Sequence, residues 1–255
     1  MNARQIAEEI FLAGVSTVLP SSLIPRQVNL KDNILSIAGR QFDIIKKKNI
    51  YVTGAGKASA MMAAEIEKIL GERITDGHIV VKYGHSCRLK HIKVTEAGHP
   101  VPDRNGFNAT RSILEIAGKA GADDLVICLI SGGGSALLAD YPEGSSQEDM
   151  MKLNNLLVNC GASISEINAV RKHLSVVKGG GLARAVYPAT LITLIISDVP
   201  GDPLDVIASG PTTPDPTTFR QALEVIHNYE LTDSVPQSLY NYLKEGNEGL
   251  HEETP

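Results

Sequence analysis

Apolar and polar residues follow one another in blocks along this chain, and the blocks have two characteristic lengths. Short uninterrupted apolar runs are typical of strands in a parallel sheet, because both faces of such a sheet are buried. Longer segments with apolar residues at helical spacing separate these runs. The pattern predicts strands at 50–52, 79–81, 92–94, 125–130 and 191–196, and helices at 3–19, 57–70, 105–120, 217–229 and 236–244.

Capping residues predict two further helices in the middle of the chain. Ser145-x-x-Glu148 and Ser163-x-x-Glu166 both have the spacing of a capping box, so each should open a helix. The first of these helices should end near Gly161. Residues 28–37 and 41–45 alternate weakly around a turn and predict a small hairpin.

Strands that alternate with helices imply a three-layer, Rossmann-like α/β fold with a mostly parallel sheet. We expect one α/β domain over residues 1–246. Residues 247–255 are polar, contain glycine and end in proline, which predicts a tail or the start of an interdomain linker.

Composition narrows the class of protein. The chain has 255 residues, of which 43% are hydrophobic and 21% charged, as in ordinary globular proteins. Its net charge of −5 argues against nucleic acid or an anionic membrane as the main partner. The N-terminus is unlike a secretory signal, and no apolar run is long enough to span a membrane. Cys128 and Cys160 lie in apolar segments, so we expect buried thiols in a soluble cytoplasmic protein.

The most informative loop is Ser131-Gly132-Gly133-Gly134-Ser135, which follows the run at 125–130. Glycines let backbone N–H groups approach an anion closely, and the N-terminus of a following helix adds partial positive charge. The loop lacks the lysine of a P-loop and the GxSxG pattern of a hydrolase elbow. It therefore predicts a phosphate or carboxylate site, with a plain tight turn as the alternative.

A second glycine-containing turn, Gly54-Ala55-Gly56-Lys57, follows the strand at 50–52. Its GxGxxA spacing is a weak dinucleotide signal, and Lys82 stands where an acid should hold a ribose, which counts against NAD. Lys57 at a helix start opposes the helix dipole and so favours an anionic partner, although a solvated lysine is the alternative.

Acidic residues and a histidine follow two other strands, where ligands of such sheets bind. Glu96 and His99 lie in a loop that two prolines stiffen, so His99 is a candidate general base or a structural histidine. Asp198 directly follows a buried strand and suits Mg²⁺ or the acceptance of a substrate proton. Asp202 is a candidate for the same metal or a turn residue.

A basic segment lies between these loops. Arg171, Lys172 and Lys178 stand beside a glycine triplet and predict either a second anion site or a solvated basic face.

Six segments together resemble the N-terminal domain of the MOFRL-type glycerate 2-kinase family, older members of which are labelled hydroxypyruvate reductase. They are GAGKA (54–58), EAGHPVPD (96–103), LISGGGSALL (129–138), EINAVRKHLSVVKGG (166–180), LIISDVPGD (194–202) and IASGPTTPD (207–215). The resemblance implies ATP-dependent phosphorylation of D-glycerate to 2-phosphoglycerate with Mg²⁺. It also implies a second, smaller C-terminal domain, which this chain lacks, so we expect a truncated or split form with that domain on a separate chain.

The resulting hypothesis gives each candidate residue a role. Lys57 and Asp198 are the catalytic candidates, and Asp198 and Asp202 the metal ligands. Phosphate or substrate binding is assigned to Gly54, Gly56, Glu96, His99, Ser131, Gly132, Gly133, Gly134, Ser135, Asn168, Arg171, Lys172, Lys178, Gly179, Gly180 and Ser209. Two alternatives stay open: a hydroxypyruvate reductase that uses NAD(P)H, and a catalytically silent domain that binds a ligand or a partner.

Overall fold

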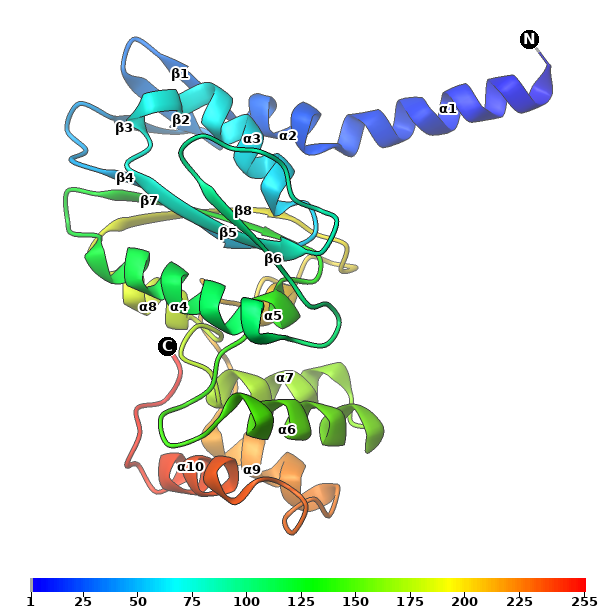
Figure 1. The fold of residues 1–255 in the computed structure, drawn as a ribbon, viewed down its shortest axis with the longest axis vertical. Helices are drawn as coiled ribbons and strands as arrows, with labels where there is room; N and C mark the ends of the chain where they lie inside the picture. Colours follow the sequence, from blue (N-terminus) through cyan, green and yellow to red (C-terminus); the bar gives the residue numbers. More distant parts are fainter. Residues whose placement is uncertain (1) are drawn as a thin grey trace.

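A computed structural model describes residues 2–255, and its centre is a five-stranded parallel sheet (Figure 1). The strand order is β6-β5-β4-β7-β8. The bounds are β4 (Ile50–Ala55), β5 (Asp76–Lys82), β6 (Lys93–Ala97), β7 (Leu125–Ser131) and β8 (Thr190–Ile196). The predicted mostly parallel α/β fold is confirmed, and the strand order changes direction between β4 and β7, where such sheets bind ligands.

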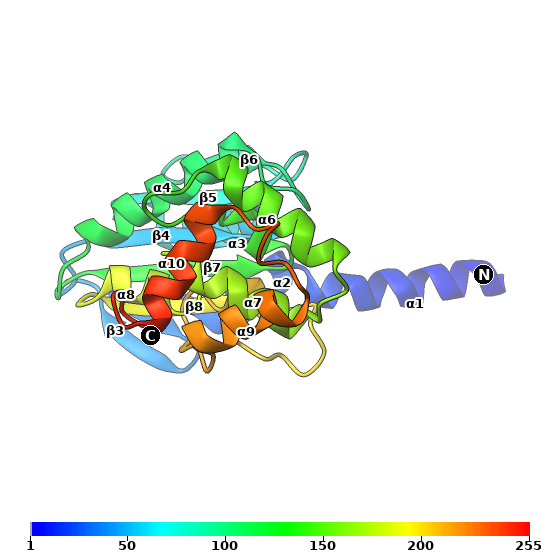
Figure 2. The same ribbon diagram turned by 90° about the horizontal axis from the view of Figure 1, so that it is seen from below.

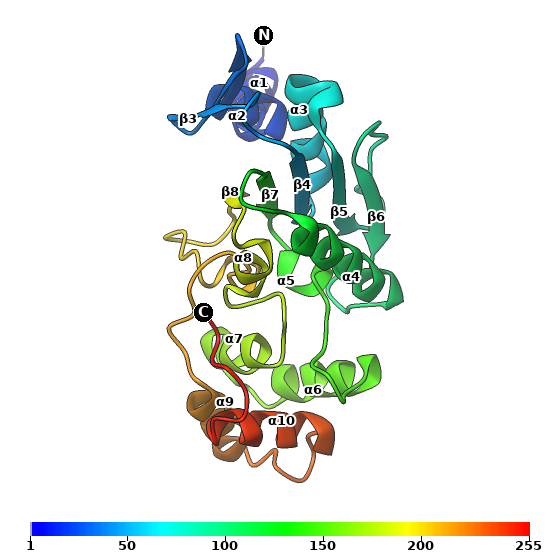
Figure 3. The same cartoon turned by 90° about the vertical axis from the view of Figure 1, so that its left-hand side faces the viewer.

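Helices and a small sheet cover the two faces of the large sheet (Figures 1 and 3). One face carries α2 (Pro20–Gln27) and α3 (Ser59–Leu70), and the other carries α4 (Arg104–Lys119) and α8 (Gly181–Val186). The small sheet packs with α2 and α3 and is antiparallel, with β1 (Val28–Lys31), β2 (Ile34–Ile37) and β3 (Arg40–Asp43). The predicted hairpin is therefore a three-stranded meander.

Four helices form a separate layer beyond α4 and α8 (Figures 1 and 2). They are α6 (Gln147–Asn159), α7 (Ile164–His173), α9 (Phe219–Asn228) and α10 (Gln237–Asn247). Their apolar faces meet in a core of their own, which includes Leu153, Val170, Ile226 and Leu243. The domain boundary at residue 246 stays a prediction.

The first helix, α1 (Ala3–Val18), projects away from the rest of the chain and has no buried residue (Figure 1). Within residues 2–255 no single helix is long and apolar enough to cross a membrane. The pair α1 and α2 passes that test together, by length and composition only, and is bent by 42°.

Some local predictions were wrong by a residue or more. Ser146 rather than Ser145 caps α6, because its side chain accepts from Asp149 N, whereas the capping box of Ser163 and Glu166 is confirmed. The helix expected from Lys57 begins at Ser59, and the helical segment after the glycine turn is a single turn, α5 (Gly134–Leu137). Cys128 is buried as predicted, but Cys160 is only half-buried.

Candidate active site

Two turns at the carboxyl edge of the sheet are fastened to each other. Ser131 ends the fully buried strand β7, and its hydroxyl accepts a hydrogen bond from Ala58 N at 2.9 Å and lies 3.2 Å from Ser59 Oγ. Lys57 N donates to Gly132 O at 3.0 Å. The turn after β4 and the turn after β7 are therefore held as one unit.

Gly54 and Gly56 make this close approach possible. A Cβ on Gly54 would overlap the backbone oxygen of Leu129, and one on Gly56 would overlap the hydroxyl of Ser131. The two glycines are thus explained by the packing of β4 against β7. Their role in ligand binding stays a prediction.

The glycine turn lies where side chains from three other loops converge. A Cβ on Gly132 would lie 2.5 Å from Asp198 Oδ2, and one on Gly133 would lie 2.7 Å from His99 Nε2 and 3.5 Å from Lys57 Cε. Gly133 has φ +87°, the left-handed conformation that glycine adopts without strain. The structure therefore brings Lys57, His99 and Asp198 together at one point.

The N–H group of Gly133 is free. Gly133 lies in no helix or strand, and within residues 2–255 no hydrogen bond uses its N–H group, whereas Gly132 directly follows the last ladder pair of β7 and β8, Ser131 and Ile196. The side chain of Lys57 is half-buried, and no carboxylate among the described residues lies within 4.0 Å of its ammonium group. A free donor and an unpaired cation together are suited to an anion.

The charge around His99 is also positive. Burial lowers the pKa of His99, and the nearby charges of Lys57 and Lys82 lower it further. A neutral imidazole can accept a proton, so His99 keeps the chemistry of a general base.

Glu96 and Asp103 act locally instead. Glu96 accepts from Gly84 N and Ser86 Oγ, and these bonds lower the pKa of Glu96 and hold the loop after β5. Asp103 caps α4 by accepting from Gly106 N.

A row of polar side chains continues from the glycine turn toward α7. Ser135 Oγ lies 2.7 Å from Ser209 Oγ, which donates to Asn168 Oδ1 at 3.1 Å. Ser209 and its neighbour Ala208 have φ +60° and +53°, a strained conformation for residues with a side chain. Such strain persists only where surrounding contacts impose it, which makes this segment a part of the candidate site.

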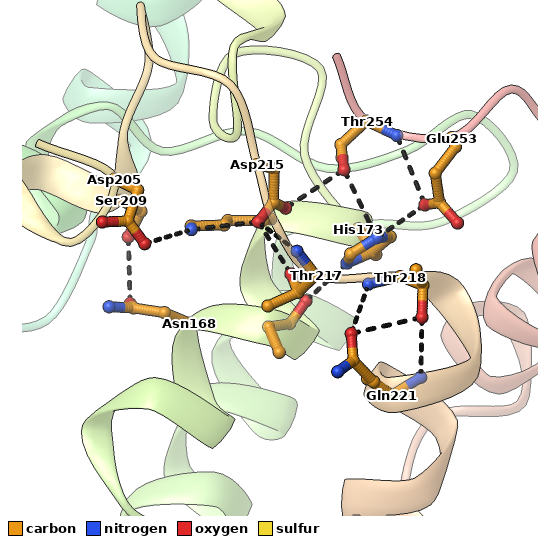
Figure 4. A network of polar contacts seen from close by, with 12 residues as sticks. Asn168, His173, Asp205, Ser209, Asp215, Thr217, Thr218, Gln221, Glu253 and Thr254 are labelled. Carbon is orange, nitrogen blue, oxygen red and sulfur yellow. Dashed lines mark hydrogen bonds and ion pairs between the residues drawn. The ribbon is translucent and has the colours of Figure 1, made fainter.

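Lys172 is buried and is paired with Asp205 and Asp215, two members of the polar network in Figure 4. Its ammonium group is 3.1 Å from Asp215 Oδ1 and 3.6 Å from Asp205 Oδ2. Asp215 also accepts from Thr217 Oγ1 and Thr254 Oγ1. Lys172 thus fixes the segment that carries Ser209, and its predicted contact with phosphate stays untested.

The glycines after Lys178 are likewise occupied within the protein. Gly179 N donates to Ser209 O, and Gly180 N donates to Gly210 O. Lys178 is buried and donates to Leu138 O and to Asp140, 3.3 Å away. The predicted second anion site therefore has few free donors from these residues.

Arg171 differs from the two lysines. Its Nε donates to Asn154 Oδ1 at 2.6 Å, and burial lowers the pKa of the guanidinium. Arg171, Ser135 and Lys178 line a cavity of about 240 Å³ between the sheet edge and the helical layer.

The proposed metal ligands are exposed. Asp198 and Asp202 both lie on the surface, and residues 2–255 contain no cluster of three or more histidine, cysteine or acidic side chains suited to a metal ion. Their metal roles stay predictions.

Sequence reasoning missed Asp140 and Asn154. Asp140 accepts from Ser175 Oγ, Val176 N and Val177 N in addition to Lys178. Its signal was an acid directly after the apolar run 136–139, whereas a helical asparagine such as Asn154 offers no sequence signal.

The chain is similar to known proteins along its whole length. Residues 6–244 match the family model described as a domain of unknown function, DUF4147. Glycerate 2-kinase of Pyrococcus horikoshii is 43% identical over 254 residues, which cover 100% of this chain and 57% of that relative.

Solved structures show the same likeness. A crystal structure of a protein from Pyrococcus horikoshii OT3 has a TM-score of 0.92 at 43% identity, and the match covers 100% of this chain and 57% of the chain in that crystal structure. A crystal structure of glycerate kinase from Thermotoga maritima has a TM-score of 0.82 at 38% identity, and the match covers 98% of this chain and 55% of the Thermotoga maritima chain. This chain spans little more than half the length of these relatives, and it belongs to the DUF4147 family, the N-terminal domain of the glycerate kinases.

Proposed function

We propose that the protein transfers a phosphoryl group from ATP to D-glycerate to give 2-phosphoglycerate, and that this chain supplies the phosphate-binding wall of the site. The observation that carries the proposal is the glycine turn, where the free N–H group of Gly133 lies close to the unpaired lysine Lys57. The names of the relatives give the substrate class.

Phosphoryl transfer depends mainly on positioning and on the neutralisation of charge. In this proposal the N–H group of Gly133 holds a phosphate oxygen, Gly132 leaves room for the phosphate, and Lys57 neutralises its charge. Ser131 holds the two turns in register, and Ser135, Ser209 and Asn168 extend the polar surface along which the substrate lies.

Asp198 suits two tasks beside this turn. Its carboxylate can accept the proton of the glycerate hydroxyl, or it can hold Mg²⁺ together with phosphate oxygens and water. Mg²⁺ is commonly bound by only one or two carboxylates beside a phosphate, so Asp198, with Asp202 as a second candidate, fits that ion. When bound, the ion would neutralise phosphate charge.

The remaining basic residues divide by their contacts. We assign Lys172 and Lys178 to positioning, because both ammonium groups are paired with buried carboxylates. Arg171 keeps free N–H groups and faces the cavity, so we assign it to ligand binding.

We also propose that the part of the relatives beyond this chain forms the second wall of the site. A single wall leaves bound phosphates in water, where charge pairs gain about a quarter of the energy that they gain at an effective dielectric constant of ~20.

We propose a cytoplasmic location for the protein, because the free thiols of Cys87, Cys128 and Cys160 suit a reducing compartment.

The test compares two reactions on two proteins: this chain alone, and this chain extended with the C-terminal part of the Pyrococcus horikoshii relative. We expect glycerate-dependent ADP release from the extended protein and activity near background from residues 1–255. Loss of NADH absorbance with hydroxypyruvate, without ADP release, would instead establish the reductase. Binding of ATP or glycerate without turnover in either protein would instead favour the silent domain.

A further inference from the structure

The cavity beside Ser135 has apolar inner walls. Met150, Phe107 and Ala139 line it and are at most 6% exposed, while Val101 and Val158 stand at its rim. Its volume of about 240 Å³ lies just below the ~300–1,000 Å³ typical of sites for whole drug-sized ligands. The cavity is therefore suited to one compact, largely apolar part of a ligand.

The polar groups that face this cavity are mainly hydrogen-bond donors. Arg171 Nε donates to Asn154 Oδ1, and this bond fixes the amide orientation because a guanidinium can only donate. Within residues 2–255, neither Asn154 Nδ2 nor the terminal amino groups of Arg171 have a hydrogen-bond or ion-pair partner. Asp140 and Lys178 also line the cavity, but they are paired with each other.

The cavity lies close to the glycine turn along the chain. Ser135 lines it and stands two residues after Gly133, a separation of at most ~7 Å along the chain. Pro100 also lines the cavity and directly follows His99. A ligand in the cavity can therefore extend a polyphosphate chain to the turn that Lys57 faces.

We propose that this cavity holds the purine base of the nucleoside triphosphate, an inference that rests on the proposed kinase function. A flat ring with apolar faces suits a cavity that Met150 and Phe107 line, and its ring nitrogens accept hydrogen bonds from Asn154 and Arg171. Glycerate carries an oxygen on every carbon and offers these apolar walls almost nothing to contact. The acid then binds on the side of the turn nearer Asp198.

The test measures binding of four probes by titration calorimetry: adenosine, ATP, inorganic tripolyphosphate and D-glycerate. Met151→Trp fills the cavity from α6, and Met61→Trp is the matched control on the exposed side of α3, where Met61 is 47% exposed. Asn154→Leu removes a donor while keeping the size of the side chain. Melting temperatures establish that each variant is folded.

We expect Met151→Trp to weaken adenosine and ATP at least ~10-fold and to leave tripolyphosphate unchanged. Asn154→Leu should act in the same direction, Lys57→Ala should weaken ATP and tripolyphosphate but not adenosine, and Met61→Trp should change none of them. If the unmodified chain binds ATP and both cavity variants bind it equally well, the base lies elsewhere and this inference alone is overturned.

Two other outcomes would also overturn the assignment of the cavity to the base. If the unmodified chain binds neither ATP nor tripolyphosphate, the proposed phosphate wall is overturned, and the inference with it. If Met151→Trp weakens D-glycerate and spares ATP, the cavity belongs to the acid and the base assignment is wrong.

Discussion

Replacing Gly133 by alanine tests whether the glycine turn is as crowded as its neighbours indicate. The variant carries two separable costs. A left-handed backbone costs a residue with a Cβ roughly 1–2 kcal/mol, and Gly133 has φ +87°. In addition, the new Cβ would lie 2.7 Å from His99 Nε2, where ordinary contact begins at 3.4 Å. The ring must therefore move by roughly 0.7 Å, and because it ends a half-buried side chain the cost lies at the low end of the about 1–3 kcal/mol that overpacking usually brings.

Gly39→Ala is the matched control, because Gly39 has φ +79° and nothing lies within 4 Å of the position of its Cβ. It carries the backbone cost alone, which lowers the melting temperature by ~2–4 °C per kcal/mol for a chain of this size. The melting temperature of Gly133→Ala should lie a few degrees below that of Gly39→Ala. It should also bind tripolyphosphate at least ~10-fold more weakly, because His99 and the methyl group enter the space of the anion.

Thermal unfolding followed by circular dichroism, together with calorimetric titration of tripolyphosphate, measures both effects. Equal melting temperatures for the two variants would refute the crowding between Gly133 and His99. A lower melting temperature with unchanged tripolyphosphate affinity would show that the turn is crowded but is not the phosphate site.

Three further predictions follow from other parts of the structure. Lys57→Ala should lower kcat of the extended enzyme at least ~10²-fold with an unchanged melting temperature, and retention of half the activity would refute its assignment. Lys172→Met leaves the buried carboxylate of Asp215 unpaired and should cost about 3–5 kcal/mol in urea unfolding, against ~0.5 kcal/mol or less for the exposed Lys244→Met. His78 is buried, and burial together with the charge of Lys93 lowers its pKa from 6.5 to about 4. Between these values the unfolded chain binds a proton that the folded chain does not, so stability falls as the pH falls. His78→Gln should reduce this loss of unfolding free energy between pH 7 and pH 5, measured by urea unfolding at each pH. An equal loss in the variant and the unmodified chain would contradict the prediction.

The elements that the sequence predicted best are those with one dominant local cause. Continuous apolar runs identified β7 and β8, and β7 is buried at every position, as such a run predicts. The burial predicted for the strand at 191–196 was wrong, because β8 lies at the edge of the sheet and is only half-buried. The convergence of Lys57, His99 and Asp198 was also predictable, since the carboxyl ends of parallel strands meet at one edge of a sheet.

Other features depend on contacts between distant residues, which no local pattern records. Lys172 and Arg171 are neighbours with similar charge, yet one is paired with Asp215 and the other faces a cavity. Gly54 and Gly56 have the spacing of a nucleotide-binding turn, but their size is required by the approach of β7. The position of each partner across the fold decides these roles.

The last residues of the chain are fastened beside the strained segment that carries Ser209. Glu253 lies 2.7 Å from His173 Nε2, and Pro255 O accepts from Asp215 N (Figure 4 shows Glu253, His173 and Asp215). A label attached after residue 255 therefore sits against the network that holds Ser209, whereas one attached before α1 extends away from the rest of the chain. A fluorophore at the C-terminus should report movements of that segment when a ligand binds, and an affinity tag is better placed at the N-terminus.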